Sequence, residues 1–506
     1  MRRVSGVLIV LLLAITLSGK CGELSHITIA GFADMQGTLN ASEDYRIARI
    51  KTLFNDIKRS NHCSLFVVSG DDLMGRYFNT FHGKAIFGLM SKLGIDAYAP
   101  GNHEFDHGAG SFAKALSYAR FNVICSDLRV KNTPLNGLCR QFIIKNICGI
   151  KIGIFSLITQ QLPLISSPGN VKLKSTNEET ARRMVKLLKR KGCNLIVALT
   201  HIGFQQDLKI ARDVKGIDLI FGGHSHNYLK QMAKTNNTLI VNGGQRATYI
   251  VKVDLYFNRD GKIQKARYRL IKTKKYKPDP ILAASLRRFK LAPSVVVGKT
   301  KTGFNLLESV LRYRESGFAD TVNDILKRRF GVDLVLNNSG MFRTDRVYPP
   351  GSITDTMLKN IFMFNNVAYI THIKGSCIKQ ILNRSAARYG HGGFLQVAGI
   401  RFTIDLSKPP QKINCNNAHS CHVTKAGKRI TGVTIDGKPL NKDRTYSVLT
   451  NDYLIKGGDG YFFFKRCGKQ TINTYMTYYW LILNYLARHR FLNEEKPDGR
   501  IKIKGR

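Results

Sequence analysis

The stretch Gly101-Asn102-His103-Glu104-Phe105-Asp106 is the most informative part of this 506-residue chain, and its surroundings explain why. It is the third of five short polar segments, each of which follows a strand-like or short apolar segment. The other four are Ala33-Asp34-Met35-Gln36-Gly37, Gly70-Asp71-Asp72, Thr200-His201 and Gly223-His224-Ser225-His226. Each fragment alone is weak, but all five in this order are a strong indication of one shared site.

The segments between these motifs predict an α/β fold, because short apolar runs alternate with helical patterns. Predicted strands in the first half are Ile27 to Phe32, Leu65 to Ser69, Asn194 to Leu199 and Asp218 to Phe221. Strand ends in one sheet converge in space, and catalytic groups of α/β proteins lie on the loops that follow them. We therefore expect the five polar segments to line one cleft.

The second half has α/β character of its own, with predicted strands at Asp333 to Leu336 and Asn366 to Ile373 and a helix near Cys377 to Ala387. Between the halves, beyond Lys272, the chain becomes rich in Lys and bounded by Pro. A helix is predicted there at Ile281 to Lys290. The sequence therefore predicts two domains joined by a short helical connection.

The side chains of the five segments suit two divalent cations, which bind carboxylate, amide oxygen and imidazole ligands. Asp34 and Asp71 supply only two negative charges for two dications. Such a site stays positive before substrate arrives and favours a phosphate dianion. A pair of ions can also lower the pKa of a bridging water and bind both the attacking and the leaving oxygen.

The series D-x-Q, G-D, G-N-H-E, T-H and G-H-x-H resembles the calcineurin-like metallophosphoesterases, and the longer string from Gly101 to Asp106 resembles their bacterial 5′-nucleotidase/UDP-sugar hydrolase branch. The resemblance implies one metal on Asp34, Gln36, Asp71 and His226. It implies a second metal on Asp71, Asn102, His201 and His224, with Asp71 bridging. It also implies that His103, oriented by Asp106, and Asn102 stabilise charge or protonate the leaving group.

The first motif departs from the family, which has D-x-H where this chain has Asp34-Met35-Gln36. Glutamine offers a neutral amide oxygen in place of imidazole nitrogen, so Mn²⁺ or Mg²⁺ would gain relative to Zn²⁺ or Co²⁺. The alternative is a damaged site that holds one metal weakly.

Four stretches of the second half resemble the 5′-nucleotidase C-terminal domain. They are Glu315 to Asp320, Asn337-Asn338-Ser339-Gly340-Met341-Phe342-Arg343, Gly392-Gly393-Phe394-Leu395-Gln396-Val397 and Gly457-Gly458-Asp459-Gly460-Tyr461. The resemblance implies substrate binding by Arg343, Phe394, Tyr461 and Asn337. Phe394 and Tyr461 would sandwich a flat base, and the Arg343 guanidinium would bind a phosphate. Taken singly, both aromatic residues are better explained as ordinary core, but their Gly-rich loops, together with the matching first half, favour base binding.

The expected architecture is a two-sheet α/β sandwich with helices outside, followed by a smaller α/β domain. The expected boundaries are a signal peptide at 1–21, a metallophosphoesterase domain at 24–275, a linker helix at 276–294 and a substrate-binding domain at 295–503. The resemblance implies attack by a metal-bound hydroxide on nucleoside 5′-monophosphates, and on nucleotide sugars as a further substrate class. It also implies that interdomain rotation carries the substrate to the metals.

Three alternatives to this activity stay open at the level of sequence. A related hydrolase would cleave 2′,3′-cyclic nucleotides or a thiosulfate group carried on a protein. A protein that keeps the fold but has lost catalytic activity would instead bind nucleic acid or an anionic surface. A nuclease would act on polymeric nucleic acid, and its affinity for long nucleic acid would fall steeply as the salt concentration rises.

Charge and cysteines bear on partners and compartment. The chain has 79 Lys and Arg against 34 Asp and Glu, a formal net charge of +45, which attracts anions. No long basic block occurs, so a basic surface with weak electrostatic attraction to nucleic acid or anionic surfaces is favoured over a dedicated nucleic-acid role.

Arg2 and Arg3 precede the apolar run Val7 to Leu17, which predicts an export signal and a periplasmic or secreted protein. Lys20 fits poorly with lipid attachment at Cys21.

Export permits disulfides, and among the 10 cysteines the pair Cys415 and Cys421, which flanks a polar loop, is the first predicted bridge. No C-x-x-C pair occurs, which disfavours a cysteine zinc site.

Overall fold

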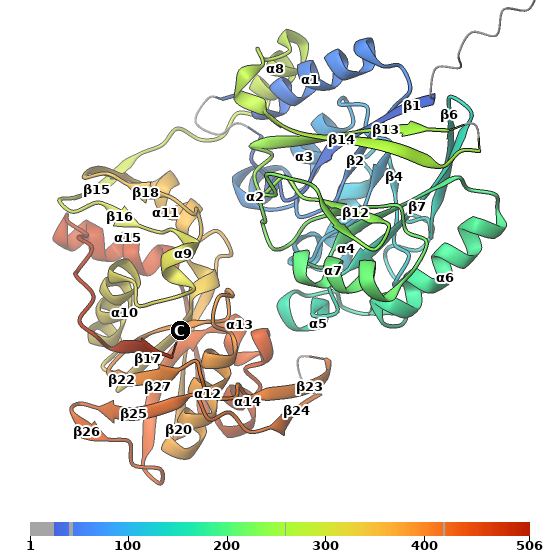
Figure 1. Cartoon of the computed structure of the whole chain (residues 1–506). Helices are drawn as coiled ribbons and strands as arrows, with labels where there is room; N and C mark the ends of the chain where they lie inside the picture. The colour runs from blue at the N-terminus through green and yellow to red at the C-terminus, as the bar shows by residue number, and fades with distance from the viewer. Residues whose placement is uncertain (1–24, 40–43, 259, 418–419, 506) are drawn as a thin grey trace, which may run out of the picture.

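The computed structural model describes residues 25–39, 44–258, 260–417 and 420–505, so the predicted signal peptide and Cys21 lie outside the described residues. Figure 1 shows two α/β domains, one blue to green and one yellow to red, joined near α8 (Pro280–Arg287) and β15 (Val296–Thr300). Within the described residues, no helix combines the length and apolar character that a membrane span needs.

The N-terminal domain contains two six-stranded sheets packed face to face. In order, the first comprises β14 (Ile263–Lys272), β13 (Tyr249–Phe257), β1 (Ser25–Phe32), β2 (Ser64–Val68), β3 (Ala97–Tyr98) and β4 (Asn122–Val123). The second comprises β11 (Ala233–Thr235), β12 (Thr238–Val241), β10 (Leu219–Gly222), β9 (Leu195–His201), β7 (Ile150–Ile158) and β6 (Ile143–Ile147). Alternate apolar residues such as Ile27, Ile29 and Val197 fill the space between them.

Helices cover the outer faces of both sheets. Those packed on the first sheet are α1 (Arg46–Ser60), α2 (Gly75–Phe81), α3 (Lys84–Met90) and α4 (Ala109–Leu116). Those packed on the second are α6 (Asn177–Arg190) and α7 (Phe204–Asp213). Helix α6 begins where the sequence supplies a capping box, since the Thr176 hydroxyl accepts from the Glu179 backbone N–H and the Glu179 carboxylate accepts from that of Thr176. The predicted two-sheet sandwich with outer helices is confirmed.

The predicted connecting helix is present as α8 (Pro280–Arg287), with Asp279 capping its first turn. Its apolar side chains Leu282, Ala283 and Leu286 are buried in the same core as α1. The helix is therefore anchored on the N-terminal domain, and residues 288–295, which follow it, cross to the second domain.

The C-terminal domain is built on a mixed five-stranded sheet and a smaller four-stranded sheet. The larger has the order β21 (Leu395–Ala398), β17 (Leu334–Asn338), β27 (Thr445–Asn451), β20 (Val367–Lys374) and β28 (Lys469–Thr477). The smaller has the order β26 (Lys438–Pro439), β25 (Ile430–Ile435), β22 (Ile400–Asp405) and β29 (Ile501–Lys504). The main helices are α10 (Gly317–Phe330), α11 (Asp355–Ile361), α12 (Gly375–Ala387) and α15 (Tyr478–His489).

Four disulfides cross-link the described residues: Cys63–Cys148, Cys125–Cys139, Cys377–Cys467 and Cys415–Cys421. The predicted pair joins the strands β23 (Lys412–Asn417) and β24 (Ser420–Lys425), so this prediction is confirmed. Two of the bridges close loops of 85 and 90 residues, the kind that restricts an unfolded chain most.

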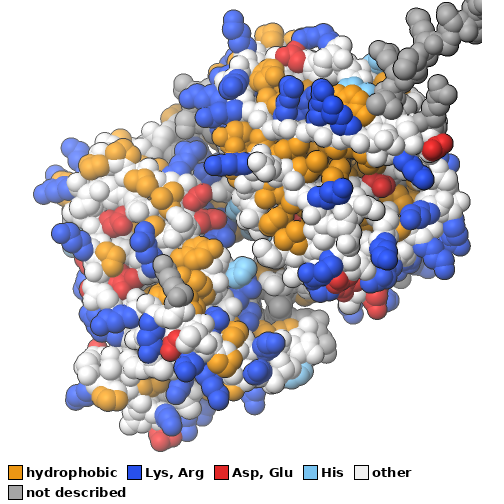
Figure 2. Space-filling model, in the orientation of Figure 1, with side chains coloured by type: hydrophobic (Ala, Val, Ile, Leu, Met, Phe, Trp, Pro, Cys, Tyr) orange, Lys and Arg blue, Asp and Glu red, His pale blue; other side chains and the backbone are white. Residues whose placement is uncertain are grey.

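Basic side chains are scattered over both domains on the face that Figure 2 shows, and they form no single patch there. This distribution agrees with the expectation of a generally basic surface.

Candidate metal centre

The polar segments emerge at one end of the two-sheet sandwich because the strands before them run parallel. Strands β1, β2 and β3 are parallel neighbours in the first sheet, as are β9 and β10 in the second. Asp34, Asp71 and Asn102 follow the first three strands, His201 ends β9, and His224 follows β10. The two sheets face each other, so the hydrophobic packing between them fixes where these loops begin.

The loops turn sharply at the ligand positions. Five of the seven predicted ligands have a left-handed backbone with φ between 53° and 78°: Asp34, Gln36, Asp71, His224 and His226. Such a conformation is costly for residues other than glycine and concentrates at functional sites. Close approach also requires a glycine at 101, where a Cβ would lie 2.2 Å from Asp71 Oδ1 and 2.8 Å from His201 Cε1.

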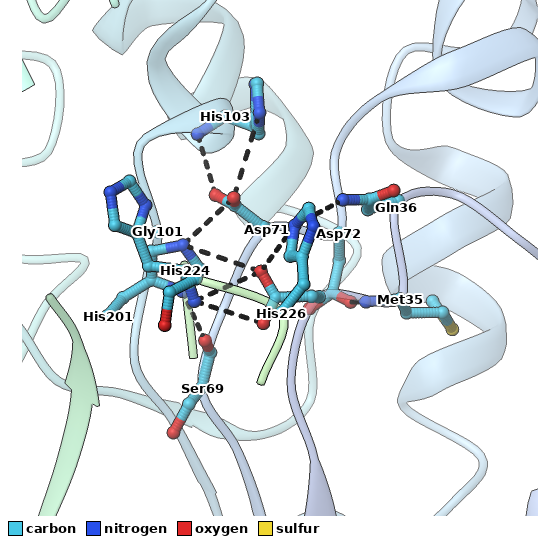
Figure 3. A network of polar contacts seen from close by, with 12 residues as sticks. Met35, Gln36, Ser69, Asp71, Asp72, Gly101, His103, His201, His224 and His226 are labelled. Atoms are coloured by element: carbon cyan, nitrogen blue, oxygen red, sulfur yellow. Dashed lines mark hydrogen bonds and ion pairs between the residues drawn. The ribbon is translucent and has the colours of Figure 1, made fainter. Parts of the chain in front are cut away.

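One cluster brings together Asp71, His201 and His224, whose ligand atoms all lie within 4.8 Å of one another. The His201 Nδ1 is 2.6 Å from the Ser69 carbonyl oxygen, which fixes the proton on that nitrogen and directs Nε2 toward Asp71 Oδ2 at 2.9 Å (Figure 3). Asn102 Oδ1 is buried and has no hydrogen-bond partner within the described residues. Asn102 precedes His103, whose backbone N–H donates to Asp71 Oδ1 at 2.9 Å, and an orphaned amide oxygen on this loop fits a divalent cation.

A second cluster adjoins the first and contains Asp34, Gln36 and His226. The Gln36 amide nitrogen is 2.8 Å from His226 Nε2, and this histidine nitrogen is 3.6 Å from Asp34 Oδ1. Asp34 is fully buried and accepts from the His224 backbone N–H at 3.1 Å. His201 Nε2 is 3.8 Å from Asp34 Oδ1, so the two clusters share a boundary. These contacts link six of the seven predicted ligands, and the seventh, Asn102, lies in the loop whose His103 backbone N–H donates to Asp71.

Burial and mutual charge set the protonation of these groups. Burial raises the pKa of Asp34 to about 6. Burial opposes ionisation of Asp71 as well, but His201 and then His103 outweigh it and hold the pKa of Asp71 well below its usual range. Burial lowers the pKa of His201, yet Asp71 and Asp34 raise it to about 10 overall. The ion-free site thus holds protons that a bound cation would displace.

His103 and Asp106 form the predicted pair, with 2.5 Å between His103 Nδ1 and Asp106 Oδ2. The Ser166 hydroxyl donates to the other Asp106 oxygen at 2.9 Å, a contact that no sequence motif indicated. His103 Nε2 then faces the clusters, 3.8 Å from Asp71 Oδ2. Burial lowers the pKa of His103, but Asp106 and Asp71 raise it overall.

Glu104 holds the two ligand loops together, as expected for a structural role. Its carboxylate is buried and accepts four backbone N–H groups at 2.6 to 3.0 Å: those of Asp71, Asp72, Leu73 and Gly101. Asp72, whose neighbour is a predicted ligand, accepts from the Met35 backbone N–H at 3.3 Å. These carboxylates therefore fix the positions of Asp71 and Asn102 without entering the cluster themselves.

The C-terminal domain faces this site with Arg343, Phe364 and Glu308. The Phe364 ring stacks on the His103 ring with centroids 5.8 Å apart, and the Arg343 guanidinium lies 5.5 Å from the Phe364 centroid. Arg343 is thus placed close to His103, and its role in phosphate binding stays a prediction. No sequence signal indicated Phe364 or Glu308, because their proximity depends on how the domains meet.

Three other predicted substrate residues lie elsewhere. Phe394 and Tyr461 are fully buried in the core of the C-terminal domain, where Tyr389 packs edge-on against Phe394 and the Tyr461 hydroxyl donates to the Gly393 carbonyl at 2.6 Å. Neither ring has a face open to a base in this arrangement, so the expected sandwich is not formed. The Gly-rich loops favoured base binding, whereas packing of the domain core covers both rings.

Asn337 is also committed to internal contacts. Its amide nitrogen donates to Asn323 Oδ1 at 2.9 Å, and its oxygen accepts from the Tyr478 hydroxyl at 2.7 Å. Both ends of the Asn337 amide are therefore satisfied inside the domain, where they position the loop that leads to Arg343, and its role in substrate binding stays a prediction.

Comparisons with known proteins agree with this architecture. The family described as calcineurin-like phosphoesterase matches residues 27–228, and the 5′-nucleotidase C-terminal domain matches residues 296–466. The trifunctional nucleotide phosphoesterase YfkN of Bacillus subtilis is 28% identical over 90% of this chain, although the chain spans only 34% of that protein. The snake venom 5′-nucleotidase of Naja atra is 28% identical over 83% of this chain and 86% of its own length.

A solved structure has the same two-domain arrangement. The 5′-nucleotidase precursor of Thermus thermophilus is 26% identical, covers 95% of this chain and 100% of its own, and has a TM-score of 0.84.

Proposed function

This chain belongs to the calcineurin-like phosphoesterases that carry a 5′-nucleotidase C-terminal domain, a family of metal-dependent phosphoester hydrolases, and we propose that it is a nucleotidase. We propose further that it is exported and uses two metal ions. Its reaction would remove phosphate from nucleoside 5′-monophosphates. The observation that carries the proposal is the convergence of six predicted ligand side chains, delivered by four strand ends, in one connected cluster.

Two neighbouring divalent ions suit these residues. Asp34, Gln36, Asp71 and His226 would hold one, and Asp71, Asn102, His201 and His224 the other. Bound there, the ions would neutralise phosphate oxygens and lower the pKa of water. The amide oxygen of Gln36 favours Mn²⁺ or Mg²⁺ over Zn²⁺ at the first position.

The residues of the chain divide the remaining work. Asp106 accepts from His103 Nδ1, so His103 presents Nε2 toward the predicted metal site at Asp71, where the bound ions would hold the phosphate. From there His103 can donate to a phosphoryl oxygen or to the leaving nucleoside oxygen. Asn102 and Arg343 would hold the developing negative charge.

Export is supported by the eight cysteines that form four disulfides, since such bridges persist in oxidising compartments. Cys193 is the free cysteine of the described residues. One of the relatives is named a venom enzyme, which agrees with a protein that works outside the cytoplasm.

Phosphate release by the metal-stripped mature chain, re-supplied with Mn²⁺, Mg²⁺, Co²⁺ or Zn²⁺, tests the proposal. AMP, UDP-glucose, 2′,3′-cyclic AMP and a non-nucleotide phosphate ester would be compared, with His103→Ala as the control. We expect metal-dependent release from AMP that the control lacks. Preference for the cyclic nucleotide would assign a phosphodiesterase, and no release from any substrate would indicate a lapsed site.

A further inference from the structure

The metal ligand His226 has a charged partner in the other domain. Glu308, the first residue of α9 (Glu308–Leu311), extends from the C-terminal domain and places Oε2 3.4 Å from His226 Nδ1. The two side chains are 21% and 11% exposed, so the pair is largely screened from water. A carboxylate near a largely buried imidazole interacts far more strongly than the same pair at the surface.

The two nitrogens of His226 face different groups. Nε2 is 2.8 Å from the Gln36 amide and 3.6 Å from Asp34 Oδ1, inside the ligand cluster. Nδ1 faces Glu308 and is the nitrogen that would carry the proton when Nε2 binds a cation. This is the arrangement in which a carboxylate orients a histidine ligand and raises its basicity.

Contacts on both sides of the domain boundary hold Glu308 in place. Arg312, one turn along the chain, forms an ion pair with Glu308 Oε1. Asp345 Oδ1 accepts from the Glu308 backbone N–H at 2.9 Å, and Asp345 Oδ2 accepts from Gln245 of the N-terminal domain at 2.7 Å. The position of Glu308 over His226 therefore depends on the two domains being in contact.

The other metal position lacks this dependence. His201 has its Nδ1 partner, the Ser69 carbonyl, within its own domain at 2.6 Å. Separation of the domains would remove the partner of His226 and leave that of His201 untouched. The two metal positions thus differ in how they respond to domain orientation.

We propose that Glu308, supplied across the domain interface, is an outer-sphere positioning residue for the metal at His226. Domain closure therefore raises the affinity of the His226 position for its metal and leaves the affinity of the His201 position unchanged. By linkage, occupancy of this position favours the closed arrangement to the same extent. The inference rests on the proposed metal site and adds to it a coupling between metal affinity and domain motion.

Mn²⁺ titration of the metal-stripped full chain by calorimetry tests the coupling without any activity measurement. Loss of an outer-shell carboxylate typically weakens metal binding by about 10- to 100-fold. We expect Glu308→Gln to weaken one of two binding steps by about tenfold or more and to leave the other within about twofold.

Asp452→Asn is the matched control, because Asp452 also begins a four-residue helix, α13 (Asp452–Ile455), and pairs with Lys456 one turn along. The Asp452 carboxylate accepts from Asn366 and Val367 of its own domain, so both binding steps should be unchanged. Gln245→Ala provides a second variant that leaves Glu308 intact. It should weaken the same step as Glu308→Gln, by a smaller factor, because it loosens Asp345.

The outcomes separate the inference from the proposed function. Absence of two binding steps in the unmodified chain would overturn both. Two normal steps in that chain, with Glu308→Gln binding equally well or losing both steps alike, would overturn the coupling and leave the nucleotidase proposal standing.

Discussion

Replacement of Glu104 by glutamine tests whether this buried carboxylate holds the ligand loops together. Oε1 accepts the backbone N–H groups of Asp72 and Leu73, and Oε2 those of Asp71 and Gly101. A glutamine keeps one oxygen and turns an amide N–H₂ toward the other two donors. Two buried donors then lose their acceptor, at about 1–3 kcal/mol each, so we expect a loss of about 2–6 kcal/mol.

The single tryptophan makes the assay specific to a domain. Trp480 lies in α15 of the C-terminal domain, so its fluorescence follows that domain, whereas far-UV circular dichroism follows both. In urea, with chelator present, Glu104→Gln should shift part of the dichroism transition to lower concentration and leave the Trp480 transition in place. Metal affinity should also fall, because the Asp71 loop is no longer fixed.

Glu315→Gln is the matched control in the other domain. Glu315 is buried and accepts the backbone N–H groups of Asp498, Gly499 and Ile501. This variant should move the Trp480 transition and leave metal binding intact. A Glu104→Gln protein whose N-terminal domain loses less than about 1 kcal/mol, with unchanged metal affinity, would refute the reasoning.

Three further predictions concern the catalytic pair, the metal preference and pH. His103→Ala and Asp106→Asn should each lower kcat by about 10²–10⁴-fold while metal content stays unchanged, because His103 acts on the substrate and not on the ions. Gln36→His should shift the preferred ion toward Zn²⁺, measured by competition with Mn²⁺. Burial raises the pKa of Asp127 from 3.8 to about 7, so folding stability should fall by about 4 kcal/mol as pH rises from about 4 to 7, and Asp127→Asn should remove this slope in urea titrations.

Each of these has a result that contradicts it. Loss of metal together with activity in His103→Ala would make His103 a structural residue. An unchanged Mn²⁺/Zn²⁺ ratio in the Gln36→His protein would show that Gln36 is no ligand. For Asp127, the sign follows from a carboxyl whose folded pKa exceeds its unfolded value: the protonated form is the stable one. A slope that persists in Asp127→Asn would therefore assign the pH dependence to other groups.

The clustering of the polar residues at the strand ends was predictable from sequence because local signals placed them. Asp34 and Asp71 each follow a β-branched or aromatic apolar run, and parallel neighbours deliver their carboxyl ends to one edge. The bridge Cys415–Cys421 was predictable for the same reason, since its two cysteines are 6 positions apart and flank a polar loop. Such features depend on residues close in sequence or on a general property of parallel sheets.

Residues that depend on long-range packing were not predictable in the same way. Glu308 and Phe364 reach the site only through the domain interface, which brings them against His226 and His103, residues far away in the sequence. For Phe394 and Tyr461, the Gly-rich loops favoured base binding. Burial of both rings follows from Tyr389 and the Gly393 carbonyl, which no local pattern reveals.

The most direct test of a two-metal nucleotidase is a Mn²⁺ titration of the metal-stripped chain in which phosphate release from AMP is followed at each addition. The account predicts no release before metal, a rise that saturates at two equivalents, and no rise in an Asp71→Asn protein, because Asp71 would serve both ions. Full release in the stripped protein, or saturation at one equivalent with no second ion bound, would contradict it.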